Sequence, residues 1–344
     1  MWGPKMTQSD VADILTGLPF AALLIGFDER VQAANAAALG LFGQAIIARH
    51  HGIALRHPEV LQAIATALSR RESSVVRQVL PGQGHEVVYR VTVSTVAAGA
   101  LCLFQDVSDQ EQAEQMRRDF VANVSHELRT PLTSLLGFIE TLRGSARDDP
   151  AARDRFLAIM ATEAERMNRL VRDLLHLSRV EAQERQRPTA HEDLARLVQT
   201  AVQSLRPLAE QSGVDLVLAG LDQPVPIQAD ADQITQVVTN LVENAIKYGG
   251  AGKWVGVSLT RQDGPRGQTV RLEVADHGEG IDPVHLPRLA ERFYRVDGHR
   301  SRDNGGTGLG LAIVKHIAQR HRGKLVVESV LGQGTRVSII LPGG

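Results

Sequence analysis

Residues 125–131 read Ser-His-Glu-Leu-Arg-Thr-Pro and place an imidazole, a carboxylate, a hydroxyl and a proline close together. Apolar residues recur around this segment at steps of three and four, which predicts a helix. His126 comes two residues after Val124, so its ring lies about 200° around the helix axis and faces away from the apolar stripe. A neutral imidazole nitrogen can attack a phosphoryl group when a carboxylate accepts the other ring proton. The segment predicts a phosphorylated histidine, with Glu127 able to act as its base.

Two other interpretations of His126 are a solvated surface histidine and a zinc ligand. Glu127 directly follows it, and Pro131 comes within five residues and permits a kink. A zinc helix of the His-Glu-x-x-His type needs a second histidine at the position of Thr130. The 12 histidines form no other convincing ligand pair in the sequence. We expect a surface location for His50, His51 and His57.

Two segments of the last third combine amide, carboxylate and glycine groups suited to a nucleotide. Asn240 and Asn244 are four apart on a predicted helix and project from the side opposite its apolar face. Amide oxygens are hard ligands that suit Mg²⁺, which bridges phosphates. Asp276 ends a predicted strand, and Gly278 and Gly280 follow it. Such a carboxylate can accept a hydrogen bond from the adenine amine while the glycines let backbone approach the ring.

A glycine-rich run over 305–310 opens a predicted helix over 312–321. Glycine-rich backbone at a helix N-terminus binds anions, here a triphosphate. Residues 292–295 read Arg-Phe-Tyr-Arg and suggest a mobile lid whose arginines pair with phosphate oxygens. The run has neither the spacing of a dinucleotide fingerprint nor that of a Walker loop. Each signal is weak alone, and their co-occurrence predicts the ATP site.

Two long amphipathic helices flank a break at 144–150 and predict an antiparallel hairpin. The apolar stripe of the first contains Phe120, Val124, Leu128, Leu132, Leu135, Ile139 and Leu142. That of the second contains Phe156, Met160, Met167, Leu170, Leu174 and Leu177, interrupted by Glu163, which the sequence does not explain. One hairpin buries little, whereas two hairpins from two chains complete a four-helix bundle, so we expect a homodimer. The alternative is a hairpin packed on its own chain.

The regions on either side of the hairpin mix helical and strand patterns. Residues up to 106 predict a small α+β domain, with a strand hairpin around 28–30, strands over 87–94 and 100–104, and a helix over 58–69. Residues after 190 predict an α/β sandwich with helices on one side of a mixed sheet. Its strands are expected over 214–218, 254–260, 270–275, 324–328 and 336–341.

Composition narrows the class of protein. The formal net charge of −1 provides no field that would recruit nucleic acid or an anionic membrane. One cysteine, Cys102, excludes an internal disulfide framework and fits a reducing cytoplasm. The longest apolar stretch near the N-terminus is about ten residues, against the roughly 20 that span a bilayer. We expect a cytoplasmic protein, or the cytoplasmic part of a longer membrane-anchored sensor, with no membrane contact within this chain.

From residue 107 to 344 the sequence closely resembles bacterial two-component sensor histidine kinases. The matching segments are 120–132 for the phosphoacceptor box, 240–248 for the N box, 276–280 and 306–310 for the two glycine boxes, and Phe293 for the F box. The resemblance implies a dimerisation and phosphotransfer hairpin over 107–187 and a Bergerat-type ATP-binding domain over 188–344. It implies ATP and Mg²⁺ as cofactors, and the receiver domain of a response regulator as partner.

The resemblance also implies roles for single residues. His126 would be the phosphoacceptor and Glu127 its base, while Thr130 would position a water that hydrolyses the aspartyl phosphate of the regulator, making the enzyme bifunctional. Asn244 would be the Mg²⁺ ligand, supported by Asn240. The other positions expected at the nucleotide are Lys247, Tyr248, Asp276, Gly278, Gly280, Phe293, Arg295, Gly306, Thr307, Gly308, Leu309 and Gly310. Among these, Lys247, Tyr248 and Arg295 would contact phosphates or ribose, and Asp276 the adenine.

Residues 1–106 resemble a PAS sensor domain more loosely, through Leu18-Pro19, Asn35 and the exit at 106–108. His277 departs from the asparagine that is more frequent at its position in the kinase family, and the arrangement as a whole is similar to phosphate-regulon sensor kinases. Two rival hypotheses are a silent nucleotide-binding scaffold and a Bergerat-type ATPase acting on DNA or client proteins. The intact His126 and Asn244 argue against the first, and the His126 hairpin argues against the second.

Overall fold

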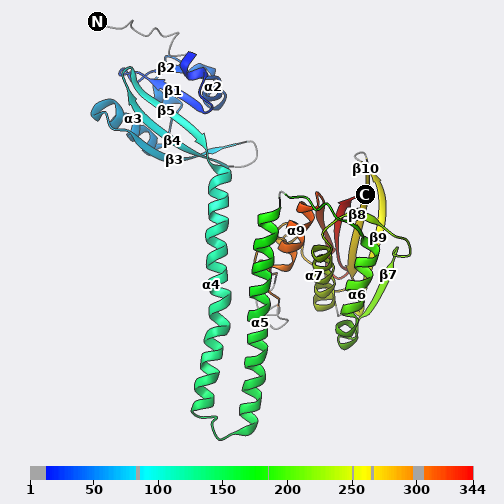
Figure 1. The fold of residues 1–344 in the computed structure, drawn as a ribbon. Coiled ribbons are helices and arrows are strands. Elements are labelled where there is room, and N and C mark those ends of the chain that lie inside the picture. Colours follow the sequence, from blue (N-terminus) through cyan, green and yellow to red (C-terminus); the bar gives the residue numbers. More distant parts are fainter. Residues whose placement is uncertain are drawn as a thin grey trace. The chain divides into compact units, whose positions relative to one another are not determined.

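The computed structural model describes residues 13–82, 86–184, 186–249, 252–264, 267–296 and 306–343. The chain divides into two compact units within one long helix, the first ending at Ala122 and the second beginning at Asn123. Each unit contains its own five-stranded sheet (Figure 1). Among the described residues, none of the helices is both long and apolar enough to cross a bilayer.

The first unit is built on an antiparallel sheet of order β2-β1-β5-β4-β3. Its strands are β1 (Ala21–Ile25), β2 (Val31–Ala34), β3 (Ser74–Pro81), β4 (Glu86–Val96) and β5 (Gly99–Asp106). Its helices are α2 (Ala36–Phe42), α3 (Pro58–Arg70) and the short 3₁₀ turns η1 (Gln44–Ile46) and η2 (His51–Ile53). The strand hairpin around 28–30, the two later strands and the helix near residue 58 are confirmed, whereas β3 was not predicted.

One face of this sheet packs against α2 and α3. Leu23, Ile25, Ile64 and Phe104 are almost fully buried in the resulting core, in keeping with the alternation of side chains along a strand. Asn35 caps α2 and is itself buried, because its Oδ1 accepts from the backbone nitrogens of Ala22 and Ala38, both at 3.0 Å. This one amide therefore ties the start of the helix to the first strand.

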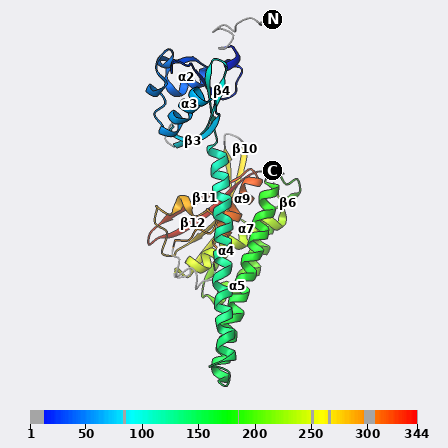
Figure 2. The same ribbon diagram turned by 90° about the vertical axis from the view of Figure 1, so that its left-hand side faces the viewer.

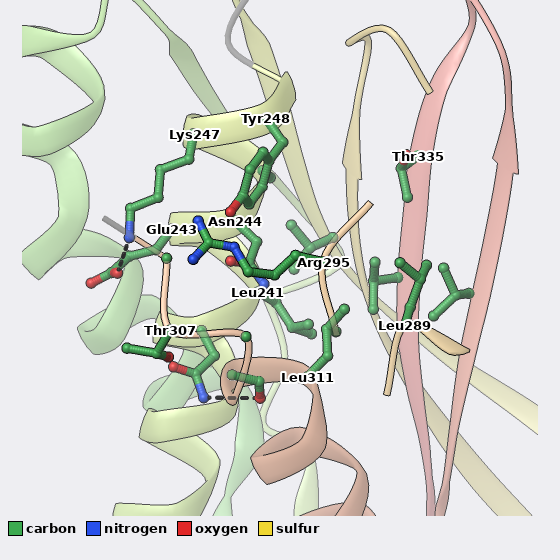
Figure 3. Close-up of a pocket in the computed structure, with 18 of the residues that line it drawn as sticks. Leu241, Glu243, Asn244, Lys247, Tyr248, Leu289, Arg295, Thr307, Leu311 and Thr335 are labelled. Atoms are coloured by element: carbon green, nitrogen blue, oxygen red, sulfur yellow. Dashed lines mark hydrogen bonds and ion pairs between the residues drawn. The ribbon is translucent and has the colours of Figure 1, made fainter. Parts of the chain in front are cut away.

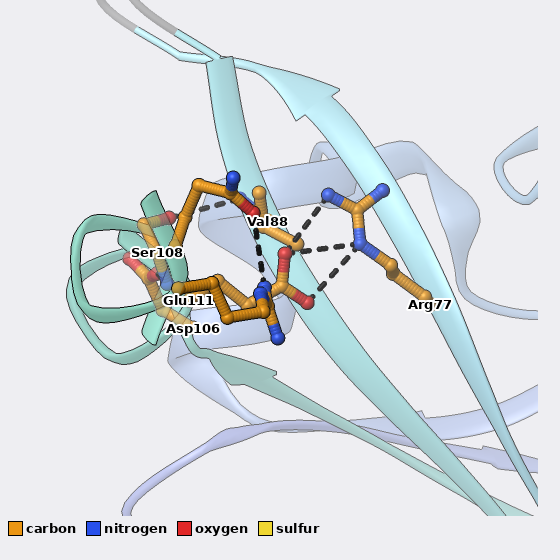
Figure 4. Close-up of polar contacts among 7 residues, drawn as sticks. Arg77, Val88, Asp106, Ser108 and Glu111 are labelled. Carbon is orange, nitrogen blue, oxygen red and sulfur yellow. Dashed lines mark hydrogen bonds and ion pairs between the residues drawn. The ribbon is translucent and has the colours of Figure 1, made fainter. Parts of the chain in front are cut away.

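The last strand of this sheet leads directly into α4 (Ser108–Arg143). Ser108 accepts a hydrogen bond from the backbone nitrogen of Val88 at 2.9 Å, which attaches the first turn of the helix to β4. One turn later Glu111 receives three hydrogen bonds of 2.9–3.1 Å from Arg77 on β3 (Figure 4). The start of α4 is therefore attached to two strands of the sheet by polar contacts.

The second unit begins with the hairpin formed by α4 and α5 (Pro150–Gln183). The predicted break at 144–150 is confirmed, and Asp149 caps α5 by accepting from the backbone nitrogen of Ala152 at 3.0 Å. From Asn123 onward α4 runs alongside α5 in both views (Figures 1 and 2). Apolar side chains stay exposed on both helices, among them Leu132, Leu136, Ile139, Leu157 and Val171.

The rest of the second unit is an α/β sandwich with a mixed sheet of order β11-β12-β10-β9-β7. The strands are β7 (Asp215–Ala219), β9 (Trp254–Gly264), β10 (Gly267–Asp276), β11 (Lys324–Val330) and β12 (Gly334–Pro342), and only the pair β7–β9 is parallel. The two short strands β6 (His191–Asp193) and β8 (Pro226–Gln228) pair separately. The five predicted strands are confirmed, while β6 and β8 were not predicted.

Three helices cover one face of this sheet: α6 (Leu194–Gln211), α7 (Ala231–Gly249) and α9 (Gly310–Arg320) (Figure 1). The short 3₁₀ turn η4 (Leu286–Arg288) lies in the loop that follows β10. Helix α7 contacts β9 and β10, and Ile234, Val238 and Leu241 of the helix are buried, as are Val257 and Leu272 of the two strands. This packing confirms the predicted sandwich and leaves the opposite edge of α7 free to carry polar residues.

Candidate active site

His126 lies on α4 with its side chain exposed, as the helical spacing predicts. The hydroxyl of Thr130, one turn later, donates to the backbone oxygen of His126 at 3.2 Å. Pro131 stands inside the helix and is buried, and because proline has no backbone N–H, it cannot donate to a carbonyl oxygen of the preceding turn. The imidazole is thus open to solvent on a helix whose hydrogen bonding is weakened just after it.

Glu127 is directed toward α5 rather than along the exposed face of His126. Its Oε2 accepts from the guanidinium of Arg166 at 3.3 Å. The same guanidinium lies 3.8 Å from Oε2 of Glu163, so Glu163 has a cationic neighbour on its own helix. The acidic residue that interrupts the apolar stripe of α5 is explained by this group of three charges.

A cavity of about 630 Å³ opens between α7, the sheet and α5 in the second unit. Figure 3 shows its lining, with side chains from α7 facing Arg295 and the glycine-rich segment before α9. The predicted residues in this lining are Asn240, Asn244, Lys247, Tyr248, Asp276, Gly280, Arg295, Gly306, Thr307, Gly308 and Gly310. Gly278, Phe293 and Leu309 lie beside it and shape it from outside the lining.

Four predicted residues come from one side of α7: Asn240, Asn244 and the adjacent pair Lys247 and Tyr248. Asn240 donates to the backbone oxygen of Gly310 at 3.3 Å and so joins α7 to the start of α9. Lys247 pairs with Glu243 at 3.0 Å, and Tyr248 stands half-exposed at the rim. In Figure 3 the Arg295 side chain reaches between Tyr248 and Asn244. Two cations and two amides therefore surround the same space.

Asp276 lies at the other end of the cavity, at the end of β10. Its Oδ1 accepts from the backbone nitrogens of Gly278 at 2.8 Å and Thr335 at 3.3 Å. Burial raises the pKa of this carboxyl, although both hydrogen bonds act in the opposite direction. A Cβ on Gly249 would come within 2.3 Å of the Asp276 side chain, so only glycine fits against the carboxylate.

The F-box position and the second glycine box are joined through their backbones. Phe293 donates its backbone N–H to the oxygen of Gly308 at 2.8 Å. Both residues have positive φ angles, 64° for Phe293 and 70° for Gly308, which is unusual for a bulky side chain. A Cβ on Gly308 would lie 2.9 Å from the Phe293 backbone. This close crossing holds the glycine-rich segment against the loop that carries Arg295.

Several residues of the cavity were not anticipated from the sequence. Asp173 and His176 of α5 line it, and the hydroxyl of Thr307 donates to Asp173 at 2.7 Å. Thr335 of β12 holds Asp276, and Glu243 holds Lys247. Glu243 and Lys247 are four positions apart on one helix face, a spacing from which their ion pair could have been predicted. The contact of Thr307 with Asp173 joins residues 134 positions apart, so no local sequence pattern predicts it.

The loops around the cavity contain one residue that differs from its prediction, Arg292, and the one departure from the family pattern, His277. Arg292 was expected to pair with phosphate oxygens, but its guanidinium lies 2.6 Å from Oε1 of Glu181 on α5. His277 stacks on Trp254, with ring centroids 4.3 Å apart and planes inclined by 16°, and it is not part of the cavity lining. The replacement of the family's more frequent asparagine by His277 therefore lies outside the cavity that Asp276 lines.

The histidines of the first unit were expected on the surface, and for His51 this is wrong, because its side chain is buried. Ligand atoms of Glu29, His50 and His51 lie within 4.8 Å of one another. However, Nδ1 of His50 accepts from the backbone nitrogen of Gly52 at 3.1 Å, so its Nε2 carries the proton and donates to Glu29 at 3.0 Å. A protonated Nε2 is not a metal donor, so this group is a hydrogen-bonded pair beside a buried histidine.

Two family models match the chain and define its class. Residues 116–183 match the His Kinase A (phospho-acceptor) domain. Residues 229–344 match the histidine kinase-, DNA gyrase B- and HSP90-like ATPases. The first covers most of the hairpin with His126, and the second covers every cavity residue from Gln236 to Val337. Hairpin and α/β sandwich together are those of a histidine kinase.

Relatives among known proteins agree with this class. The chain is 38% identical over 244 residues to the sensor histidine kinase WalK of Bacillus subtilis, covering 71% of this chain and 39% of WalK. It is 41% identical over 238 residues to the phosphate regulon sensor protein PhoR of Pseudomonas aeruginosa, covering 68% of this chain and 52% of PhoR. The chain thus spans about half or less of these relatives. It belongs to the sensor histidine kinases of two-component systems.

A solved structure has a similar fold. The crystal structure of the histidine kinase ThkA in complex with the response regulator protein TrrA aligns with a TM-score of 0.51 at 21% identity. The alignment covers 96% of this chain and 98% of ThkA. At that identity the likeness concerns the fold alone.

Proposed function

We propose that this chain transfers the γ-phosphoryl group of ATP to its own His126 and then to an aspartate of a response regulator. The observation that carries the proposal is the occurrence, in one compact unit, of an exposed His126 and of a cavity lined by Asn244, Asp276 and Arg295. The two family models that cover these parts support the same activity. The ThkA–TrrA complex, although a different protein, supports a response regulator as partner.

In the proposed reaction one imidazole nitrogen of His126 attacks the γ-phosphorus. A P–N bond forms as the bond to the bridging oxygen breaks, and ADP leaves. Glu127 accepts the proton from the other ring nitrogen, which keeps the attacking nitrogen nucleophilic. The phosphoramidate is reactive, which suits an intermediate that is passed to a carboxylate. Thr130, exposed one turn after His126, would hold the water for a separate reaction, the hydrolysis of the aspartyl phosphate on the regulator.

The cavity suits ATP and a divalent cation. Its volume of about 630 Å³ falls within the range of roughly 300–1,000 Å³ usual for small-molecule sites. Asp276 would accept from the adenine amine, and Lys247, Tyr248 and Arg295 would contact phosphates or ribose. Asn244, supported by Asn240, would hold Mg²⁺, which neutralises phosphate charge when bound. Oxygen donors and cations on one wall of the cavity fit this set.

A labelling experiment tests the proposal. The purified chain is incubated with γ-labelled ATP and Mg²⁺, and label on the protein is tested for stability in acid and base. We expect acid-labile, base-stable label in the wild type and none in His126→Gln. Label that persists in His126→Gln would contradict the assignment of the acceptor. Absence of label in a folded, ATP-binding wild type would instead favour a silent scaffold.

We also propose that the chain acts as a homodimer. Leu132 and Ile139 of the predicted apolar stripe of α4 stay exposed within one chain, and so does Leu136 beside them. A second hairpin would cover them in a four-helix bundle. The match to the His Kinase A domain supports this interpretation.

The three-part division 1–106, 107–187 and 188–344 remains our proposal for the domains. The antiparallel sheet of the first unit, with α2 and α3 on one face, supports a PAS-like sensor domain ahead of α4. The polar attachment of Ser108 and Glu111 to the sheet supports a sensory role, because it couples that sheet to the helix leading to His126. The similarity to PhoR supports a sensor of the phosphate-regulon type.

A further inference from the structure

Arg166 is the residue of α5 that meets the predicted base of His126. It lies 39 residues from Glu127 in the chain, and its guanidinium donates to Oε2 of Glu127 at 3.3 Å. The side chains of Arg166 and Glu127 are 15% and 24% exposed, so the contact is largely screened from water. In such surroundings an ion pair holds its geometry better than an exposed pair does.

The ion pair with Arg166 uses only one of the two carboxylate oxygens of Glu127. Arg166 meets Oε2, so Oε1 is left for a second donor. On a helix, neighbouring side chains do not face each other, so a carboxylate next to a histidine reaches that ring only if its rotamer is held. Anchoring Oε2 against α5 restricts the rotamers of Glu127, so the carboxylate keeps a fixed place on the helix turn that carries His126.

Glu163 completes the arrangement from the helix that carries Arg166. Its Oε2 lies 3.8 Å from the other terminal nitrogen of the guanidinium, and its side chain is 26% exposed. When Glu127 accepts a proton it becomes neutral, and the largely buried guanidinium of Arg166 would then lose its partner at a substantial cost. Glu163 still compensates the guanidinium at that moment, so Arg166 stays in place through the proton transfer.

We propose that Arg166, held by Glu163, is a positioning residue for the phosphorylation of His126 and acts through Glu127. This inference rests on the proposed function. It follows the general pattern in which a base is oriented by a third group, here a guanidinium from the second helix of the hairpin. A base contributes roughly 10²–10⁴-fold to such a reaction, so losing its orientation costs a part of that factor.

The test compares initial rates of His126 labelling in the full chain at varied ATP concentration. Arg166→Met keeps the length and loses the charge. We expect kcat to fall about tenfold while the KM for ATP stays unchanged, because Arg166 lies outside the cavity lining. Arg166→Lys should recover part of the rate, since an ammonium can still meet one carboxylate. Arg153→Met, an exposed arginine of the same helix, is the matched control and should keep the wild-type rate.

A double substitution separates positioning from a general loss of structure. In a Glu127→Gln background, Arg166→Met should change the rate by less than about twofold, because the group it acts on is gone. An undiminished effect in that background would overturn the proposal, and so would a wild-type kcat in folded Arg166→Met. Glu163→Gln should lower kcat less than Arg166→Met, and a larger loss would contradict its supporting role. If the wild type itself carries no label, the proposed function fails instead.

Discussion

The hydroxyl of Thr307 donates to Oδ2 of Asp173 at 2.7 Å, although the two residues lie 134 positions apart. Thr307 belongs to the glycine-rich segment expected to bind a triphosphate, and Asp173 belongs to α5 of the hairpin. Burial raises the pKa of Asp173, while the bond from Thr307 acts in the opposite direction. The contact therefore ties the nucleotide segment to the phosphotransfer hairpin and places an acid in the cavity wall.

Asp173→Asn should bind ATP more tightly than the wild type. The amide keeps an oxygen that accepts from Thr307, but it removes a negative charge that opposes the triphosphate. We expect an affinity gain of about threefold to tenfold at low ionic strength that shrinks with added salt. Calorimetric titration with ATP checks this. Asp154→Asn, at an exposed site on the same helix, serves as the control, and equal affinities for both variants would refute the electrostatic role of Asp173.

Asp276→Asn should lose nucleotide binding without losing stability at neutral pH. Burial raises the pKa of Asp276 in the folded state, so the folded protein binds this proton more readily than the unfolded chain does. The resulting stabilisation is present at acidic pH and is lost as pH rises through the raised pKa. At pH 7 the buried carboxylate therefore costs stability, and the amide removes that cost.

Thermal melts across pH measure this effect. The midpoint of Asp276→Asn should be at or above that of the wild type at pH 7, and the advantage should shrink toward about pH 4. ATP affinity should fall by about tenfold to a hundredfold, the size of a lost charge-assisted hydrogen bond. A variant that melts much lower at pH 7 but still binds ATP would reverse both expectations.

Gly308→Ala should weaken both stability and nucleotide binding. The residue has a φ of 70°, and an added Cβ would lie 2.9 Å from the backbone of Phe293. A left-handed conformation costs an L-residue about 1–2 kcal/mol, and the free energy of unfolding should fall by about that amount. Denaturant titration measures it. Gly40→Ala in α2 has no atom within 4 Å of the new Cβ and should be neutral or stabilising, so equal losses at both sites would exclude this cause.

The elements with regular periods were predictable from the sequence, and the irregular ones were not. Helices α4, α5, α7 and α9 and the five strands of the second sheet carry clear apolar repeats. Edge strand β3 contains Arg77 and Gln78 in its middle, so its alternation is interrupted. Strands β6 and β8 have three residues each, too few for any period to show.

The residues of the candidate site likewise fall into those that a local sequence pattern predicts and those that it does not. The spacing of polar residues on the single helix α7 predicts Asn240, Asn244, Lys247 and Tyr248. Eleven of the predicted nucleotide-site residues, Asp276 among them, line one cavity. Asp173 and Arg166 act across helix contacts that no local pattern encodes. The direction of Glu127 was likewise not predictable, because adjacency in sequence suggested His126 whereas packing turns the carboxylate to α5.

Leu132→Asp should dissociate the proposed dimer. Leu132 is 50% exposed within one chain, so covering its exposed half contributes about 0.8–1.5 kcal/mol per copy, and burying a carboxylate at this position adds a larger penalty. Because a symmetric dimer carries the change twice, we expect the dissociation constant to rise by at least about a hundredfold in sedimentation equilibrium. Leu41→Asp, an exposed leucine of the first unit, is the control. A wild type that is monomeric at micromolar concentration would remove the basis for this prediction.

Thr130→Ala should separate the two proposed activities. The Thr130 hydroxyl donates to the backbone oxygen of His126, and the helix is complete without that bond, so labelling of His126 should remain within about twofold of wild type. Dephosphorylation of the response regulator should slow about tenfold or more, because the water loses the hydroxyl that orients it. Thr133→Ala is the matched control, since Thr133 makes the same kind of bond to Arg129 at 3.0 Å. If both variants dephosphorylate the regulator at the wild-type rate, Thr130 has no part in the hydrolysis.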